Sequence, residues 1–130
     1  NPALGHITTF GGHPVSCAAA FGMLTTLLDQ KLTEKVDSKA TRIKEALEQH
    51  EIVKEVRHAG LMMGVELTRR KYLKHVVGNA YENGLIVDFF LFNDRSFRIA
   101  PPLIIEDHHI DEALKILIEA LDFAASKYKK

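Results

Sequence analysis

The chain has 130 residues, of which 46% are hydrophobic and 26% are charged, a balance typical of a soluble globular protein with a real core. Its 17 Lys and Arg residues equal its 17 Asp and Glu residues, so no net basic charge points to nucleic acid or to an anionic membrane. No apolar run reaches the roughly 18 residues of a membrane-spanning helix, and Cys17, the single cysteine, cannot form an internal disulfide. We therefore expect no nucleic-acid or membrane partner, and a reducing compartment such as the cytoplasm.

Residues 5–14 place two adjacent hydroxyls and two adjacent glycines just before a predicted helix. Gly11 and Gly12 permit turns and close backbone approaches that a Cβ would block. The hydroxyls of Thr8 and Thr9 can donate hydrogen bonds to an anionic oxygen. Such a turn can present hydroxyls and free N–H groups to a phosphate or a carboxylate. Taken by itself, however, a Gly-Gly turn before a helix is more often a simple boundary between elements.

The first predicted helix runs from Pro14 to about Gln30 and is apolar on nearly every side. Because such a helix needs cover all round, we expect it to pack against another domain or subunit. Cys17 lies within it, where a buried and inert thiol is more common than a nucleophile.

A second helix is predicted from Thr33 to about Gln49, because apolar residues recur at helical spacing opposite a charged face. The apolar stripe consists of Leu32, Val36, Ala40, Ile43 and Leu47. The change from an apolar helix to an amphipathic one places the expected domain boundary near residues 30–33.

The remainder predicts an α+β domain. Val53 and Val56 precede a likely bend at residues 58–60, and the alternating apolar residues that follow over residues 61–67 indicate a strand with one apolar face. A helix follows over residues 71–83, ended by Gly84, with its inward side chains expected to be Leu73, Val76, Val77, Ala80 and Tyr81.

Residues 85–92 then read as a buried apolar strand, Asn93-Asp94 as a turn, and residues 96–99 as the returning strand. The last helix is predicted from about Asp107 to Tyr128, with acidic residues at its start and lysines at its end.

Three blocks, in order along the chain, resemble the class III aminotransferases, which are fold-type I enzymes dependent on pyridoxal 5'-phosphate. The first resembles the family block T-[FY]-G-G-N-P-x-x-C-A-A, although His13 replaces the usual Asn, and reads Thr9-Phe10-Gly11-Gly12-His13-Pro14 followed by Ser16-Cys17-Ala18-Ala19-Ala20. The second resembles a scaffold strand, G-L-M-x-G-[IV]-E-L, and covers residues 60–67. The third resembles R-[FI]-x-P-P-L and reads Phe97-Arg98-Ile99-Ala100-Pro101-Pro102-Leu103.

The resemblance implies a fold and a domain division. Residues 33–130 are expected to form the small C-terminal domain, an α+β domain with an antiparallel sheet of three to four strands packed by helices. Residues 1–32 are expected to be a segment of the large cofactor-binding domain, made of the phosphate-contacting loop and a long connecting helix.

The resemblance also implies the site. In the family the threonine of the first block reaches the cofactor phosphate of the neighbouring subunit, which gives Thr9 that role here, with Thr8 as a weaker candidate, and implies an obligate homodimer. The arginine of the third block binds a substrate carboxylate, so Arg98 becomes the expected clamp. Without the resemblance, Arg98 would read as a surface arginine on an edge strand.

The family's Schiff-base lysine precedes the first block by a few tens of residues, and the acidic partner of the pyridine nitrogen lies earlier still. Both would fall before Asn1, so we assign no catalytic residue, and we expect a C-terminal fragment that does not catalyse amino-group transfer alone. Within the longer enzyme the reaction would move an amino group between an amino acid or amine and a 2-oxo acid.

Other classes of function remain open on the residues alone. The α+β segment could be a small ligand-binding module of the ACT type, or a dimerisation domain without catalysis. Within the same family, an aminomutase, a racemase or a decarboxylase would carry similar blocks. A metal site is not expected, because the seven histidines are scattered and form no ligand motif. Ser16 and Ser96 lack the base motif of a serine hydrolase.

Overall fold

The computed structural model describes residues 8–128 and divides the chain into two units, residues 1–33 and 34–130. The elements run in the order α1 (Pro14–Asp29), α2 (Leu32–Glu48), β1 (Val53–Ala59), β2 (Met62–Leu67), α3 (Arg70–Glu82), β3 (Asp88–Phe90), β4 (Asn93–Ile99) and α4 (Asp107–Ser126). The domain assignment of residues 1–32 and 33–130 stays a prediction.

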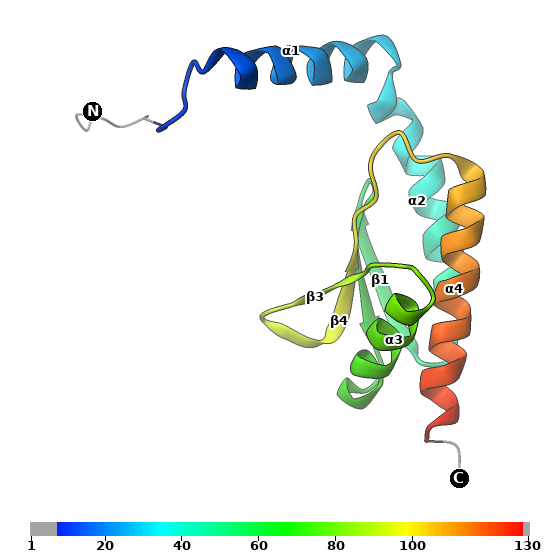
Figure 1. The fold of residues 1–130 in the computed structure, drawn as a ribbon. Coiled ribbons are helices and arrows are strands. Elements are labelled where there is room, and N and C mark those ends of the chain that lie inside the picture. The colour runs from blue at the N-terminus through cyan, green and yellow to red at the C-terminus, as the bar shows by residue number, and fades with distance from the viewer. Residues whose placement is uncertain (1–7, 129–130) are drawn as a thin grey trace. The chain divides into compact units, whose positions relative to one another are not determined.

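The second unit contains a four-stranded sheet in the order β1-β2-β4-β3, in which every neighbouring pair is antiparallel. Helices pack on this sheet, so the predicted α+β class with an antiparallel sheet of three to four strands is confirmed (Figure 1). The register sets Arg57 opposite Gly64, Gly64 opposite Arg98, and Arg98 opposite Asp88. Side chains in one such row point to the same face of a sheet, so these four residues share one face.

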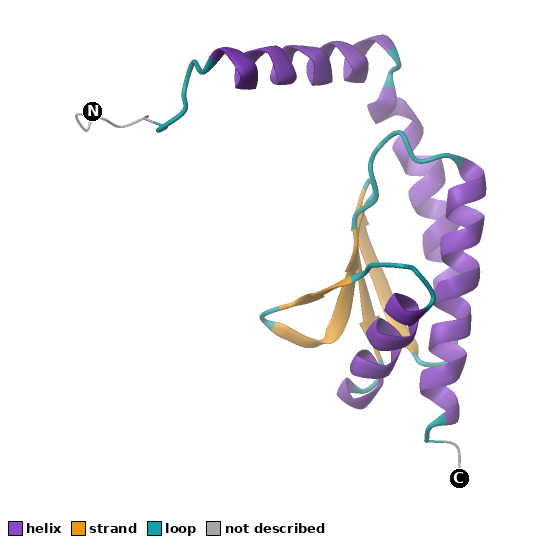
Figure 2. Cartoon of the chain, in the orientation of Figure 1, coloured by secondary structure: helices purple, strands orange, loops and turns teal. Residues whose placement is uncertain are grey.

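The other face of the sheet is covered by helices and holds the core. Figures 1 and 2 show α3 and α4 on the same side of the strands. Ion pairs from Arg42 to Asp111 and Asp107 join α2 to α4. The largest fully buried side chains are Phe97, Leu47, Met63, Leu67, Ile110, Leu121, Val56, Val65 and Val76.

Glycines allow two of the turns in this unit. Gly84 has φ +87°, which confirms the predicted left-handed end of α3. Gly60 has φ +55° in the turn between β1 and β2, and a Cβ there would lie 3.2 Å from the Val36 Cγ2 atom. Both a left-handed backbone and a close neighbour therefore favour glycine at position 60.

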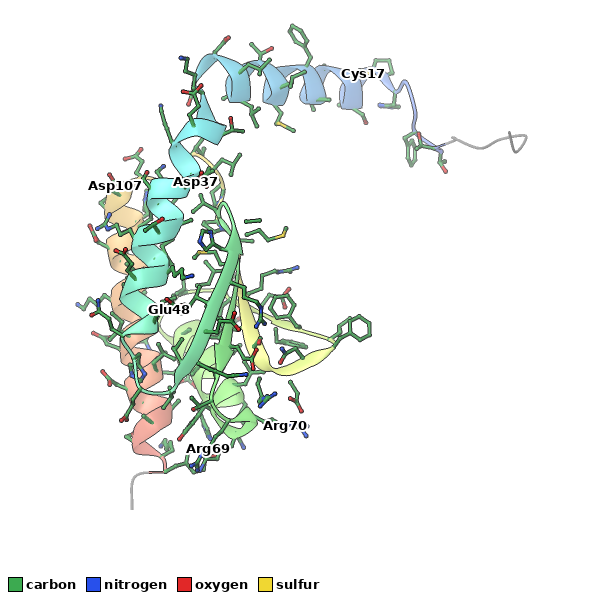
Figure 3. The ribbon with its side chains drawn as sticks, turned by 180° about the vertical axis from the view of Figure 1, so that it is seen from behind. Cys17, Asp37, Glu48, Arg69, Arg70 and Asp107 are labelled. Atoms are coloured by element: carbon green, nitrogen blue, oxygen red, sulfur yellow. The ribbon has the colours of Figure 1, made fainter. Side chains whose placement is uncertain are left out.

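Helix α1 is as apolar as its sequence suggests, yet it has no buried residue. Phe21 is 73% exposed and Leu28 is 63% exposed. The expectation of a buried thiol is wrong for this chain, because Cys17 is exposed and labelled on α1 in Figure 3. A helix with apolar residues on every side and none of them buried lacks the cover that its sequence calls for.

The prediction of a buried strand over residues 85–92 is wrong. Strand β3 covers three residues, and the side chains around it are exposed, with Ile86 at 81%, Leu91 at 84% and Phe92 at 100%. β3 is an edge strand, and the β3–β4 hairpin extends away from the helices (Figure 1). The turn lies at Leu91-Phe92 rather than at Asn93-Asp94, because Asn93 already pairs with Phe90 in the ladder.

Four of the five side chains predicted to face inward on α3 do so, because Leu73 and Val77 are partly buried against the core in addition to two fully buried residues. Val76 and Ala80 are buried as expected, but Tyr72 is buried in place of Tyr81, which is 69% exposed. The Tyr72 ring packs edge-to-face on Tyr128 at 5.6 Å, and this long-range contact is invisible in the local pattern.

Candidate functional site

The turn before α1 carries the two threonines predicted to contact phosphate. The Gly11 N–H donates to the Thr8 carbonyl oxygen at 3.2 Å, and the His13 N–H donates to the Phe10 carbonyl oxygen at 3.1 Å. The side chains of Thr8 and Thr9 are exposed. The first three residues of the stretch 5–14 lie outside the described part of the chain.

This turn has room for the Thr8 hydroxyl because its fourth residue, Gly11, has no side chain. A Cβ on Gly11 would lie 2.6 Å from the Thr8 Oγ1 atom, closer than real Cβ contacts come. Gly12 has φ +78°, a conformation that glycine adopts at no steric cost. His13 gives no side-chain cap to α1, so its first-turn N–H groups lack a side-chain acceptor. The threonine hydroxyls and these N–H groups are hydrogen-bond donors with no carboxylate among them in this turn. Such a group of donors fits a phosphate, as in pyridoxal phosphate.

His13 occupies the position where the family block has Asn. Its ring lies edge-to-face against Phe10, with the ring centroids 6.2 Å apart. The His13 backbone N–H donates to the Phe10 carbonyl oxygen, and the imidazole ring makes this packing contact.

Arg98, the predicted carboxylate clamp, lies on the sheet face that the helices leave uncovered. Its side chain is 45% exposed, so the guanidinium is not enclosed in the packing of this unit. Within residues 8–128 its one hydrogen-bond partner is Asp88, the residue opposite it on β3. The Asp88 carboxylate is itself held by the Phe89 N–H at 2.8 Å. Because Asp88 accepts from one of the five N–H donors of Arg98, a pair of parallel donors remains for another carboxylate.

Arg98 borders an open hollow of about 510 Å³ on this face. The lining comes from β1, β2 and the β3–β4 hairpin, and includes Arg57, Met62, Gly64, Phe90 and Phe92. A Cβ on Gly64 would lie 3.4 Å from two atoms of the Phe90 ring, so this ring lies over the glycine between the two arginines. A second hollow of about 290 Å³ lies near α4 and residues 99–105, and its described lining has no charged residue to hold a carboxylate.

A network of charges around Glu66 lies next to this hollow. Glu66 accepts from Lys54 Nζ at 2.8 Å and from Arg57 Nη1 at 2.9 Å, and Arg95 Nη2 lies 3.8 Å away. The Glu66 side chain is 7% exposed beneath these cations. The hydrogen bonds from Lys54 and then Arg57 lower the pKa of Glu66 from 4.5 to about 2.

Arg57 is also hydrogen-bonded within this network. Its Nη1 atom also donates to Glu55 Oε2 at 2.7 Å, and hydrogen bonds to Glu66 and then to Glu55 raise the pKa of its guanidinium. Arg57 and Arg98 therefore lie on either side of Gly64 but have different ion pairs. Arg57 pairs with two carboxylates, whereas Arg98 pairs with one.

Sequence reasoning missed Asp88 and Glu66 as neighbours of the site. Glu66 sits in an alternating strand, where a polar residue reads as a solvated position. Its burial depends on Lys54, Arg57 and Arg95, which come from two other strands. The register between β3 and β4 would have been the one usable signal for Asp88, since it brings Asp88 opposite Arg98.

Residues 8–128 contain neither a candidate membrane span nor a candidate metal cluster. None of their helices is long and apolar enough to cross a membrane. No group of three or more His, Cys, Asp or Glu side chains among them could hold a metal ion.

Comparisons with known proteins agree with the resemblance. Acetylornithine aminotransferase of Caldanaerobacter subterraneus is 38% identical over 120 residues, which cover 89% of this chain and 30% of that relative. Leucine/methionine racemase of Thermococcus litoralis is 39% identical over 132 residues, with 92% and 29% covered. The chain thus spans about 30% of the length of the curated relatives it matches.

A solved structure has the same fold. Ornithine aminotransferase from Toxoplasma gondii superposes with a TM-score of 0.82 at 30% identity, covering 96% of this chain and 30% of that one. That structure has partial occupancy of PLP at its active site. Residues 2–121 match the family model for class III aminotransferases, and a match over this much of the sequence shows that the chain belongs to the class III aminotransferase family.

Proposed function

We propose that a protein containing this chain is a pyridoxal-phosphate-dependent aminotransferase that moves an amino group between an amino acid or amine and a 2-oxo acid. The observation that carries the proposal is the placement of Arg98, a half-exposed guanidinium bordering a hollow on the uncovered sheet face. Family membership supplies the reaction class. Because the chain spans about 30% of its relatives, the activity is proposed for the longer protein.

Arg98 binds the substrate carboxylate in this proposal. Two parallel N–H donors of a guanidinium match the two oxygens of a carboxylate, which fixes the orientation of the substrate as well as its affinity. Asp88 keeps the guanidinium in place through the ion pair on β3. A substrate fixed in this way presents its amino-bearing carbon in one orientation.

The turn before α1 binds the phosphate of the cofactor. Thr9, with Thr8 beside it, donates hydroxyl hydrogen bonds to the phosphate, and the uncapped N–H groups of α1 add to the attraction. Pyridoxal 5'-phosphate, when bound, supplies the aldehyde that accepts the amino group and a ring that withdraws electrons from the substrate. Neither Thr8 nor Thr9 moves a proton in this scheme, because their role is to hold the phosphate.

Thr9 acts on the cofactor of the neighbouring subunit, so the active protein is a homodimer. Support comes from helix α1, which begins five residues after Thr9 and exposes the apolar surface of a segment that packs against another domain or subunit. A cytoplasmic location fits Cys17 as the single, unpaired cysteine of the sequence.

The reactive lysine is assigned to the remainder of the longer protein. Lys54 is committed to Glu66, and Lys39 donates to the Ile105 carbonyl oxygen in the same unit. Neither lysine has the desolvated setting that activates an amine. In this proposal the longer protein supplies the reactive lysine, so we expect the 130-residue chain alone to show no amino-group transfer.

The first experiment compares Arg98→Gln with Arg70→Gln in the full-length, cofactor-loaded protein. Arg70 begins α3 and pairs with Asp94, and Figure 3 labels it near the hairpin, so it is a matched surface arginine. We expect Arg98→Gln to lower kcat/KM by roughly 100-fold, mainly through KM, because two charge-assisted hydrogen bonds are lost. Arg70→Gln is expected to change it less than about twofold. Equal kinetics for Arg98→Gln and the unchanged protein would overturn the role of Arg98.

The second experiment tests which subunit each residue serves. Thr9→Ala and Arg98→Gln subunits are mixed to form hybrid dimers. If Thr9 serves the neighbouring site and Arg98 its own, each hybrid dimer has one site with both native residues and one site with both changes. Hybrids should then regain about half of the native activity, whereas either pure variant stays low. No recovery in verified hybrids would contradict the action of Thr9 across the dimer.

Cofactor retention gives a readout that does not depend on turnover. Thr9→Ala is expected to raise the dissociation constant of pyridoxal phosphate by about tenfold, the effect of about one charge-assisted hydrogen bond. Thr41→Ala, an exposed threonine on α2, is the control and should leave it unchanged.

Racemisation is a second candidate reaction, favoured by the match to a leucine/methionine racemase. A racemase inverts a single amino acid and needs no 2-oxo acid partner. Incubation of the full-length protein with one L-amino acid, followed by chiral separation, distinguishes the two reactions, because a D-enantiomer formed without any 2-oxo acid would identify a racemase.

A further inference from the structure

The hollow beside Arg98 is lined largely by apolar side chains, although the guanidinium at its border is charged. Its floor is Gly64 with the Phe90 ring over it, and its walls include the exposed side chains of Met62 and Phe92. Met62 is 66% exposed and Phe92 is 100% exposed, so both present apolar surface to whatever enters. An arginine beside such a surface can bind a molecule with one charged end and one apolar end.

The second arginine of the hollow does not supply another free positive charge. Arg57 donates to both Glu55 and Glu66, and Glu66 also neutralises Lys54. A second carboxylate arriving near Arg57 would have to compete with two resident acids that are already hydrogen-bonded.

The other polar residues that line the hollow, His58 and Asn93, do not supply a free positive charge either. His58 pairs with Met63, whose buried side chain faces the helices, so alternation along β1 points the imidazole away from the Arg98 face. The side-chain oxygen of Asn93 accepts from the Arg95 N–H at 3.0 Å, within its own hairpin.

Asp88 adds a negative charge at the Arg98 end of the hollow. It is 52% exposed and directly opposite Arg98. One substrate carboxylate can still use the free donors of the guanidinium. A second carboxylate on the same molecule would approach Asp88, and among the described residues that line the hollow the other guanidinium, Arg57, is already paired with two acids.

We propose that the hollow selects amino acids and 2-oxo acids with a single carboxylate and an apolar side chain. The carboxylate pairs with Arg98, and the apolar side chain lies along Phe90, Gly64 and Met62. This selection rests on the proposed role of Arg98 as the carboxylate clamp. It disfavours dicarboxylic acids, because their second carboxylate would lie against apolar walls and near the Asp88 carboxylate instead of near an unpaired cation.

The test uses two unreactive acids with the same five-carbon chain, pentanoate and glutarate. Pentanoate ends in a methyl group where glutarate ends in a second carboxylate, so the pair isolates the polarity of that end. Binding of each acid to the full-length, cofactor-loaded protein is measured by calorimetry. We expect pentanoate to bind at least about tenfold more tightly, since burying a charge without a partner costs more than this factor.

Phe90→Ala and Leu91→Ala form a matched pair of variants. Phe90 lines the hollow, whereas Leu91 is its 84% exposed neighbour in the same hairpin and does not line it. Each buried methylene corresponds to about a fourfold change in dissociation constant. Phe90→Ala is therefore expected to weaken pentanoate binding by about fourfold or more and glutarate binding by less than twofold, while Leu91→Ala changes neither.

Met62→Ala keeps the test valid if Phe90→Ala does not fold. Met62 is largely exposed, so its truncation leaves the core intact and should weaken pentanoate in the same direction. Glutarate binding as tightly as pentanoate would overturn the proposed selection. The same holds if both Phe90→Ala and Met62→Ala, correctly folded, bind pentanoate like Leu91→Ala, which would mean that another part of the protein covers the hollow.

Arg98→Gln separates this selection from the proposed function. If Arg98→Gln abolishes the binding of both acids while they bind equally well to the native protein, Arg98 is the clamp and the apolar selection is wrong. If Arg98→Gln changes neither acid, the clamp role fails, and the selection that rests on it fails with it.

Discussion

The two faces of the four-stranded sheet are built from the same strands and differ in almost every other respect. The face toward the helices carries Val56, Met63, Val65 and Phe97, each at most 1% exposed. The opposite face carries ion pairs around Glu66 and the Arg98–Asp88 pair. Because side chains alternate along a strand, adjacent residues such as Phe97 and Arg98 point to opposite faces, one into the core and the other onto the open face. It follows that charged residues on the open face can be substituted without repacking the core.

The largest effect is expected on the covered face, from Phe97→Ala. Phe97 is fully buried, so its truncation removes apolar contacts and leaves a cavity. We expect a loss of about 3–5 kcal/mol in the free energy of unfolding, the usual cost of such a change. Urea denaturation of the 130-residue chain, followed by circular dichroism, measures it.

Phe89→Ala is the matched control, because Phe89 is the cross-strand partner of Phe97 and is 57% exposed. It should cost about 1 kcal/mol or less, since little apolar surface is lost from the core. Equal losses for the two variants would mean that the hairpin, and not the helix-covered core, stabilises this unit.

The second largest effect is expected on the open face, from Glu66→Gln. The change removes the acid shared by Lys54 and Arg57 and leaves two cations near each other. We expect a clear loss of stability, smaller than that of Phe97→Ala, measured by the same denaturation. Glu34→Gln, a change of an exposed acid in the first turn of α2, serves as the comparison and should act more weakly.

The pH dependence gives an independent check on Glu66. The folded pKa of about 2 lies below the ordinary 4.5, so folding favours the ionised carboxylate. The stabilisation is complete above pH 4.5 and is lost as the pH falls from 4.5 toward 2. Glu66→Gln should flatten the stability profile in this window, and an unchanged acid limb would contradict the network.

The elements with a strong local pattern were predictable from the sequence. The stripe containing Ala40, Ile43 and Leu47 is buried on α2 as its spacing indicates, and Ile110 and Leu117 are buried on α4. The exposure of Arg98 also follows from its neighbours, because Phe97 takes the covered face and alternation gives Arg98 the other.

The apolar run at residues 85–92 could not be read in the same way. A continuous run of apolar residues predicts burial only if something covers it, and coverage is a property of the whole fold. Here the run forms an edge strand and a hairpin tip, with Phe92 fully exposed. The buried state of Glu66 was hidden for a related reason, since its three cationic neighbours meet only through the register of the strands.

Ser96→Ala is expected to act with the opposite sign. Ser96 is fully buried, and within residues 8–128 its hydroxyl has no hydrogen-bond partner. Removing a buried hydroxyl without a partner should raise the free energy of unfolding by about 1 kcal/mol. Ser38→Ala, an exposed serine that donates to the Lys35 carbonyl oxygen, should change it by less than about 0.5 kcal/mol. A loss of stability in Ser96→Ala would show that the hydroxyl has a partner, such as a buried water.

The smallest effect on stability is expected from Arg98→Gln, the change with the largest expected effect on substrate binding. Its ion pair with Asp88 joins side chains that are 45% and 52% exposed, and such surface pairs contribute about 0–1 kcal/mol. Denaturation of the 130-residue chain should therefore place Arg98→Gln within about 0.5 kcal/mol of the native sequence. Asp88→Asn breaks the same pair from the other side and should give the same small change. If either variant lost as much stability as Phe97→Ala, the open face would be part of the folding core, and the separation between the two faces of the sheet would be wrong.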